Sequence, residues 1–275
     1  PAYLNPYEND NLIRLGQDYD GGYLVDKKSV LSTDVLIAIG ISYDWSFERD
    51  FFKLNKCKIT AYDGSVGRKF FIAKIKTRIK NTFKNLSLEY FIKTVWWLLL
   101  PVRFFIFFNN LNFQKKKKHF ELFVYENKPN FDSEYFVKKN GYNPNFIEFN
   151  EIIKKISTEK NIFLKIDIEG DEYSLLNSLI KLENRLVSLV IEFHNLNKVN
   201  YKILEDFISE FKLNLCHTHI NIAGSFNEDG TPKVIELTFI KDIMSDTRVN
   251  SLPHILDMNT FPTDIKYEVT FWRNN

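Results

Sequence analysis

The feature that most constrains the fold is an alternation of short, mainly apolar runs with segments of helical pattern. The clearest runs are residues 34–40, 161–167 and 186–194, and each is followed by a segment in which apolar residues recur at helical spacing. Continuous apolar strands between helices are typical of a parallel sheet covered on both faces. The remaining expected elements are strands at 57–63 and 121–126 and helices at 47–54, 133–139, 149–156, 171–182 and 199–212.

The end of the chain has a different pattern. Residues 213–221 and 233–240 read as two strands, and a turn at 227–230 between them predicts an antiparallel hairpin. We find no internal repeat and no linker-like stretch. The prediction is therefore one α/β domain over 1–275, with a doubly wound, mostly parallel seven-stranded sheet, a terminal antiparallel hairpin and an N-terminal cap segment over 1–33.

Charge is distributed unevenly. Residues 66–120 hold 13 Lys and Arg and one acid, a net of 13 − 1 = +12, so the rest of the chain carries +2 − 12 = −10. Ile72, Ile75, Ile79 and Phe83 recur at helical spacing among these basic residues, and aromatic residues crowd 96–108. This stretch predicts a basic, aromatic helical insertion that is buried against the sheet or a second copy, touches a membrane surface, or captures an anionic substrate. Nucleic acid is a poor partner for an otherwise acidic body.

Cysteine content and the start of the chain bear on the compartment. Cys57 and Cys216 are too few for a disulfide framework or a zinc knuckle, and we expect buried thiols. The first residues lack a signal-peptide pattern, and the apolar stretch 95–108 is short for a spanning helix and contains Pro101 and Arg103. A cytoplasmic protein is expected, with peripheral contact to the inner membrane as an alternative.

Polar residues interrupt the apolar runs where the predicted strands end. Gly40 and Asp44 follow the first run, Asp63 ends the second, and Asp167 and His194 end the next two. Ligands bind in such sheets outside the carboxyl ends of the strands. The sequence therefore predicts one site at this edge.

Residues two apart on a strand share a face, which groups Lys165, Asp167 and Glu169, then Glu192 and His194, then His217, His219 and Asn221. A buried carboxylate needs a partner, so Glu192 either pairs with Lys165 or serves the site. His194 is either a core histidine or a functional one, and His217 and His219 belong either to the hairpin edge or to the site. We expect His119, after four lysines, to be solvated.

The turn after the first run excludes two nucleotide-binding loops. It lacks the Gly-Lys-Ser/Thr of a phosphate-binding loop and the three glycines of the dinucleotide fingerprint. Asp63 follows Gly40 by 23 residues, about where such folds place the acid that binds ribose hydroxyls. A nucleoside without a pyrophosphate, such as S-adenosylmethionine, fits this pattern.

The chain resembles the FkbM-type family of S-adenosylmethionine-dependent O-methyltransferases. The resemblance is carried by residues 14–23, 40–48, 61–63, 190–194, 217–221 and 235–239, and most specifically by Lys165-Ile-Asp-Ile-Glu-Gly170. It leaves out mainly 66–120. It implies the seven-stranded methyltransferase sheet and a loop at 20–23 that folds over cofactor or substrate. A single Asn221 stands where relatives often have Gly-Asn-Asn.

The resemblance also implies functional residues. The implied cofactor contacts are Asp20, Gly21, Gly22, Tyr23, Gly40, Ile41, Ser42, Asp44, Phe47, Glu48, Asp63, Gly64, Ser65 and Asp167. The substrate candidates are Glu169, His217, His219 and Asn221.

We take His194 as the hypothetical general base for a sugar hydroxyl. Asp167 or Glu192 would orient it, or these three residues would hold Mg²⁺ or Mn²⁺. The implied acceptor is a hydroxyl of a bacterial surface glycan, such as a capsular polysaccharide, or of its lipid-linked precursor. The alternatives are a glycosyltransferase that anchors a metal–diphosphate through Asp167 and Glu169, and a catalytically silent glycan- or cofactor-binding module.

Overall fold

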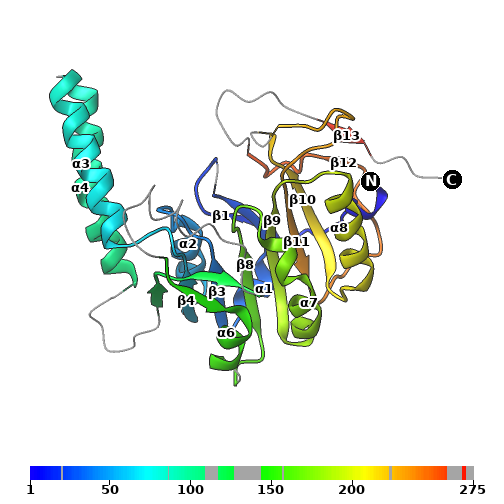
Figure 1. Ribbon diagram of the computed structural model, residues 1–275. Helices are drawn as coiled ribbons and strands as arrows, with labels where there is room; N and C mark the ends of the chain where they lie inside the picture. The colour runs from blue at the N-terminus through cyan, green and yellow to red at the C-terminus, as the bar shows by residue number, and fades with distance from the viewer. Residues whose placement is uncertain are drawn as a thin grey trace.

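The centre of the molecule is a seven-stranded sheet (Figure 1). The structure is a computed structural model that describes residues 1–19, 21–85, 87–108, 117–126, 144–156, 158–222, 225–258 and 268–270. The strand order is β10-β11-β9-β8-β3-β4-β5. The strands are β3 (Val35–Ile39), β4 (Lys58–Tyr62), β5 (Lys117–Phe120), β8 (Ile162–Ile166), β9 (Leu186–Phe193), β10 (Asn214–Ile220) and β11 (Ile235–Ile240).

The sheet is mixed, which corrects the prediction of a mostly parallel one. The pairs β5–β4, β4–β3, β3–β8 and β8–β9 are parallel. β11 runs antiparallel to both β9 and β10, because the terminal hairpin folds back and its second strand lies between its first strand and β9. The predicted antiparallel pairing of this hairpin is confirmed.

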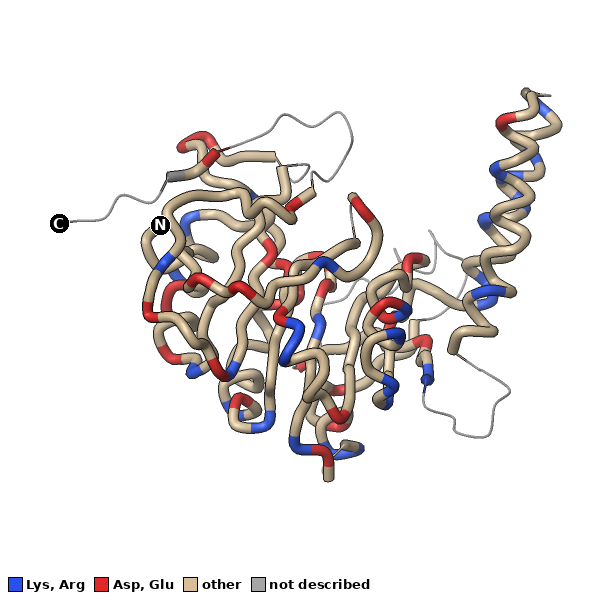
Figure 2. Tube along the Cα trace, turned by 180° about the vertical axis from the view of Figure 1, so that it is seen from behind, with Lys and Arg blue, Asp and Glu red and all other residues tan. Residues whose placement is uncertain are grey.

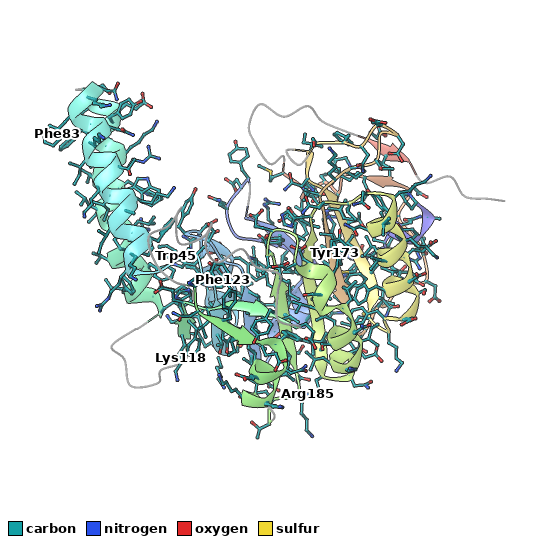
Figure 3. All side chains as sticks on the ribbon, in the orientation of Figure 1. Trp45, Phe83, Lys118, Phe123, Tyr173 and Arg185 are labelled. Atoms are coloured by element: carbon teal, nitrogen blue, oxygen red, sulfur yellow. The ribbon has the colours of Figure 1, made fainter. Side chains whose placement is uncertain are left out.

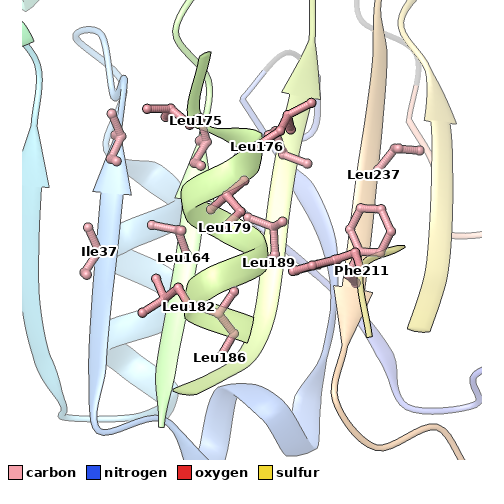
Figure 4. Close-up of a cluster of buried hydrophobic side chains, with 14 of the residues drawn as sticks. Ile37, Leu164, Leu175, Leu176, Leu179, Leu182, Leu186, Leu189, Phe211 and Leu237 are labelled. Carbon is pink, nitrogen blue, oxygen red and sulfur yellow. The ribbon is translucent and has the colours of Figure 1, made fainter. Parts of the chain in front are cut away.

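Helices cover both faces of the sheet, as predicted. Side chains at alternate positions of β3 enter different cores: Ile37 packs with α6, α7 and α8, whereas Leu36 packs with α1 and α2. Figure 4 shows Ile37, Leu164 and Leu189 beneath the leucines of α7. The helices are α1 (Lys27–Ser32), α2 (Ser46–Leu54), α6 (Phe149–Lys155), α7 (Glu172–Leu182) and α8 (Lys198–Glu210). The mainly apolar sequences of β3, β8 and β9 are therefore explained by the burial of these strands on both faces of the sheet.

Smaller elements surround the sheet. Within the predicted cap, β1 (Leu12–Leu15) and β2 (Tyr23–Asp26) form an antiparallel hairpin. This hairpin is tied to the sheet where the Thr238 hydroxyl donates to the carbonyl of Leu24 at 2.7 Å. The other elements are the 3-10 helices Ala2–Leu4 and Glu183–Arg185, the parallel pair β6 (Phe123–Tyr125) and β7 (Phe146–Glu148), and the antiparallel pair β12 (Ser251–Leu252) and β13 (Val269–Thr270). Cys57 and Cys216 are free and buried, as expected.

Most of the basic insertion is a helical hairpin, α3 (Arg68–Asn85) and α4 (Leu88–Phe108), which we call the arm. The arm extends away from the body (Figures 1 and 3). Its base is packed: Trp97, Leu100, Phe104 and Phe108 of α4 are buried in one cluster with side chains of β3 and β4.

The end of the predicted insertion belongs to the sheet instead. Residues 117–120 form the edge strand β5, which pairs in parallel with β4. His119 is not solvated as expected, because its ring lies 5.0 Å from that of Phe104 and 5.6 Å from that of Phe108, between centroids. Burial lowers the pKa of His119 to about 4. The helix expected at 133–139 lies outside the described residues.

Candidate active site

The turn after β3 brings two strand ends into contact. Gly40 has φ +75°, and a Cβ atom there would lie 1.5 Å from the backbone oxygen of Asp167. The Asp167 amide donates to the Ile39 carbonyl at 2.9 Å. The glycine is therefore needed for the close approach of the β8 end, and it places Asp167 beside the turn.

Asp63, at the end of β4, holds the same turn from the other side. One carboxylate oxygen accepts from the amides of Ile41 (3.0 Å) and Ser42 (2.7 Å), and the other accepts from the amide (2.7 Å) and hydroxyl (2.6 Å) of Ser65. A carboxylate offers about four acceptor sites. Asp63 therefore shapes the turn with its full acceptor capacity, and the ribose contact implied for it would require exchange of one of these donors.

A cavity of about 160 Å³ opens between the ends of β3, β4 and β8. Its polar wall includes six predicted site residues, namely Gly40, Asp63, Gly64, Ser65, Asp167 and Glu169, together with Asp171. Its aromatic wall comes from β6 and β7, through Phe123, Tyr125 and Phe146 (Phe123 is labelled in Figure 3). Apolar walls with a few convergent polar groups are typical of small-molecule sites, and flat aromatic ligands suit rings like these.

Charged side chains gather beside the cavity. His194 Nδ1 lies 2.9 Å from Glu172 Oε1, and His194 Nε2 lies 4.0 Å from oxygens of both Asp167 and Glu192. We call these four residues the carboxylate–histidine cluster. Neighbours fix its orientation: the Tyr23 hydroxyl donates to Asp167 at 2.9 Å, and the Asn221 amide donates to Glu192 at 2.8 Å. Asp167 belongs to both the cluster and the cavity wall.

The cluster bears on the hypothesis that His194 acts as a neutral general base, which stays a prediction. Burial lowers the pKa of His194, but the hydrogen bond to Glu172 and the charges of Glu192, Glu172 and Asp167 outweigh it and raise this pKa to about 9. This environment favours the protonated imidazole at pH 7. In this state His194 balances the surrounding carboxylates.

Three members of the cluster form a candidate metal site, as the sequence suggested. One ligand atom each from Asp167, Glu192 and His194 lies within 4.8 Å of the others. Carboxylate oxygens with one imidazole suit Mg²⁺ or Mn²⁺. A histidine must be neutral to bind a metal ion. A cation at this site would therefore compete with a proton for His194.

The proposed pairing of Glu192 with Lys165 is not what the structure shows. The Lys165 ammonium donates to the Gly40 carbonyl at 3.1 Å and lies 4.9 Å from the centroid of the Tyr23 ring. Lys165 thus supports the turn and the tyrosine that holds Asp167.

The predicted substrate residues of the hairpin lie apart from the cavity. Both imidazoles contact Asp257, at 3.1 Å for His217 and 3.3 Å for His219, and both side chains are nearly buried. Although burial opposes ionisation, these imidazoles hold the pKa of Asp257 well below its usual range. Glu169, the fourth candidate, is 87% exposed beside the cavity, with one oxygen 3.7 Å from His194 Nε2.

Several implied cofactor contacts do not line the cavity. Phe47 is buried against Tyr23, with ring centroids 5.6 Å apart, and Asp44 accepts from Ser46 at the start of α2. Glu48 is fully buried, burial raises its pKa to about 7, and its carboxylate has no hydrogen-bond partner among the described residues. The others outside the cavity are Gly21, Gly22, Tyr23, Ile41 and Ser42, whereas Asp20 lies outside the described residues.

Sequence reasoning missed residues that the structure adds to the site. Glu172, fully buried at the start of α7, also accepts from the amides of Ile168 and Gly170. Glu236 lies opposite Glu192 across the β11–β9 ladder, and burial together with Glu192 raises its pKa well above the usual range. A carboxylate in the middle of the apolar run of β11 was the signal that could have identified Glu236.

Strand order and helices on both faces define a Rossmann-like α/β protein. No protein-family model matches the chain, and no curated protein sequence matches it at a significant level. Among solved structures, it is similar to methyltransferase FkbM from Methylobacillus flagellatus KT, at 13% identity and TM-score 0.38, covering 76% of this chain and 47% of that one.

Two further similarities are to a methyltransferase from Pyrococcus furiosus and to TYW2 from M. jannaschii in complex with AdoMet. The first has 13% identity and TM-score 0.33 and covers 83% of this chain and 90% of that one. The second has 10% identity and TM-score 0.29, over 86% and 89%. Because every TM-score is below 0.5, the fold assignment rests on strand order and direction, and any function rests on the site.

Proposed function

We propose that the protein is an S-adenosylmethionine-dependent O-methyltransferase. The observation that carries the proposal is the position of Asp167, which lines the aromatic-walled cavity and also belongs to the carboxylate–histidine cluster. A group at this junction can touch a reacting centre between a cofactor and an acceptor. The motifs shared with FkbM-type enzymes support the same reading.

The cavity fits the chemistry of the cofactor. Phe123, Tyr125 and Phe146 would hold the adenine by stacking, and Asp171, in the same wall, offers a carboxylate for ribose hydroxyls. The carboxylate of Asp167 favours a sulfonium cation nearby. When bound, the cofactor supplies an electrophilic methyl group for in-line displacement, a reaction whose main demand is positioning.

The cluster would prepare the acceptor. Asp167, fixed by the Tyr23 hydroxyl and by its own backbone, is our candidate for receiving the hydroxyl proton. A positive charge on His194 would offset the negative charges of Asp167 and Glu192, each 4.0 Å from its Nε2 atom. A divalent cation on Asp167, Glu192 and His194 would instead lower the pKa of the hydroxyl itself.

We further propose a sugar hydroxyl of a bacterial surface glycan, or of its lipid-linked precursor, as the acceptor, and a cytoplasmic location. The acceptor class follows from the family resemblance alone. The acidic cluster is compatible with a neutral, hydroxyl-rich ligand, because carboxylates accept hydrogen bonds from sugar hydroxyls.

Calorimetric titration with S-adenosylhomocysteine tests cofactor binding. We expect one site per chain, and a loss of affinity of about tenfold or more in Phe123→Ala, because base–aromatic stacking contributes roughly 1–3 kcal/mol. Phe226→Ala, which removes a ring that is 45% exposed on the body, is the matched control and should bind normally. Absence of binding to the unmodified chain contradicts the proposal. A thermal shift with a UDP-sugar and Mn²⁺, but none with S-adenosylmethionine, would favour a glycosyltransferase.

Turnover of a glycan acceptor tests the role of Asp167. Asp167→Asn keeps the shape of the side chain, so binding of S-adenosylhomocysteine should stay within a few-fold while the rate falls at least about 100-fold. Equal loss of binding and rate would mean that Asp167 serves the cofactor only. If a chelator abolishes turnover by the unmodified protein and added Mg²⁺ or Mn²⁺ restores it, the metal-assisted route is identified.

A further inference from the structure

The arm has an apolar face that the described protein leaves uncovered. At 3.6 residues per turn, the buried side chains of α4 lie on one side of the helix and a second apolar set lies on the opposite side. The buried set is Thr94, Trp97, Leu100, Phe104 and Phe108. The open set, with 38–74% exposure, is Leu88, Phe91, Ile92, Val95, Leu99, Val102 and Ile106.

A helix that is apolar on all sides is normally enclosed by protein or by lipid. The structure encloses little of α4: it has the length and composition of a membrane-crossing helix, and only 28% of its most apolar window is buried. Both ends of the arm return to the body, since α3 follows β4 and α4 precedes β5. The arm can therefore enter a bilayer only from one side, and the basic residues of α3 oppose its crossing.

The other helix of the arm supplies positive charge. α3 carries seven basic residues and no acid, as the blue segments in Figure 2 show. Over residues 68–108 the net charge is 9 − 1 = +8. Two arms packed face to face would bring two such charges together, which disfavours a second copy as the partner. An anionic surface complements the arm.

We propose that the arm binds the surface of an anionic lipid bilayer. The open face of α4 enters the boundary between headgroups and acyl chains, together with Phe83 near the tip of α3, which is 75% exposed. The long side chains of Lys76, Lys80 and their neighbours reach the lipid phosphates. Trp96, 44% exposed, is a residue type favoured at the headgroup level.

Vesicle flotation tests this with the intact protein and without reference to activity. We use phosphatidylcholine vesicles with ~30 mol% phosphatidylglycerol, at low salt, against phosphatidylcholine alone and against high salt. We expect the protein to float with the anionic vesicles and the bound fraction to fall at least about tenfold in either comparison, since each basic residue contributes about 1 kcal/mol. Failure of the unmodified protein to float at low salt overturns the proposal.

Paired variants separate the two contributions. Ile92→Ser with Leu99→Ser and, separately, Lys76→Glu with Lys80→Glu should each abolish flotation. The matched controls on the body, Val199→Ser with Ile255→Ser and Lys154→Glu with Lys155→Glu, also change exposed positions and should float normally. Normal flotation of both arm variants overturns the proposal. A different result would assign the open face to a second copy. In that case the unmodified chain would not float, it would sediment as a dimer, and Ile92→Ser with Leu99→Ser would convert the dimer to a monomer.

Discussion

The carboxyl edge of the sheet and the arm reverse the usual placement of polar and apolar groups. At the edge, Glu172, Glu192 and Lys165 are buried, and each is held by neighbouring polar groups. On the arm, a row of large apolar side chains is exposed among lysines. Buried charge costs stability unless it is paired, and exposed apolar area gains nothing until something covers it. The buried charges therefore indicate a ligand at the edge of the sheet, and the exposed apolar row indicates a partner for the arm. The two regions can be tested separately.

The largest effect is expected at the turn of the site. Gly40→Ala places a Cβ atom 1.5 Å from the Asp167 backbone oxygen, where no side chain can move aside. We expect a loss of more than about 4 kcal/mol in the free energy of unfolding, enough to prevent folding. Gly230 has a similar φ of +80° with no atom within 4 Å of its Cβ position, so Gly230→Ala should cost about 1 kcal/mol in urea denaturation. Equal costs would show that backbone strain alone explains Gly40.

Within the arm, a pair of substitutions compares the two faces of one helix. Phe104 is fully buried and Ile106 is 62% exposed. Phe104→Ala should lower the free energy of unfolding by about 3–5 kcal/mol, and Ile106→Ala by less than about 0.5 kcal/mol. A substantial loss for Ile106→Ala, measured by urea denaturation, would mean that the open face is covered in solution.

The histidine of the cluster should make stability depend on pH above neutrality. The pKa of His194 is about 9 in the folded protein, above its ordinary value of 6.5, so protonation stabilises the fold below pH 6.5. This stabilisation, about 3 kcal/mol, is lost as pH rises from 6.5 through 9. His194→Gln should lack that decline. A parallel decline in both proteins would exclude the cluster as its origin.

Glu48 should show an effect of similar size in a lower pH range. Burial raises its pKa to about 7, above its ordinary 4.5, so the fold favours the protonated form and stability falls as pH rises from 4.5 to 7. Glu48→Gln should therefore be more stable than the unmodified chain at pH 8, by about 3 kcal/mol, and equal to it near pH 4. No gain at pH 8 would mean that Lys165 already compensates the charge.

Sequence pattern was sufficient where burial on both faces dictates composition. The strands β3, β8 and β9 and the helices that follow them lie where the apolar runs placed them. β5 was missed because Lys117–Phe120 is a polar edge strand that reads as part of the basic stretch. The mixed direction of the sheet depends on where the hairpin docks, which no local pattern encodes.

The sequence pattern could group residues at one edge of the sheet, but it could not indicate their charge states. Gly40, Asp63 and Asp167 line one cavity because parallel strands end at one edge. The charge on His194 depends on carboxylates from β8, β9 and the start of α7, so it follows from distances that a linear sequence does not contain. Asp257, which holds His217 and His219, is distant in sequence from both.

The route of the chain between cavity and arm has a mechanical consequence. Ser65 lines the cavity and is bonded to Asp63, and α3 begins at Arg68, with Val66 buried between them. Because this connection is short and buried, a tilt of the arm would act on Ser65 and on the hydrogen bonds that Ser65 donates to Asp63. A partner that holds the arm would therefore also restrain the part of the cavity wall that Ser65 forms.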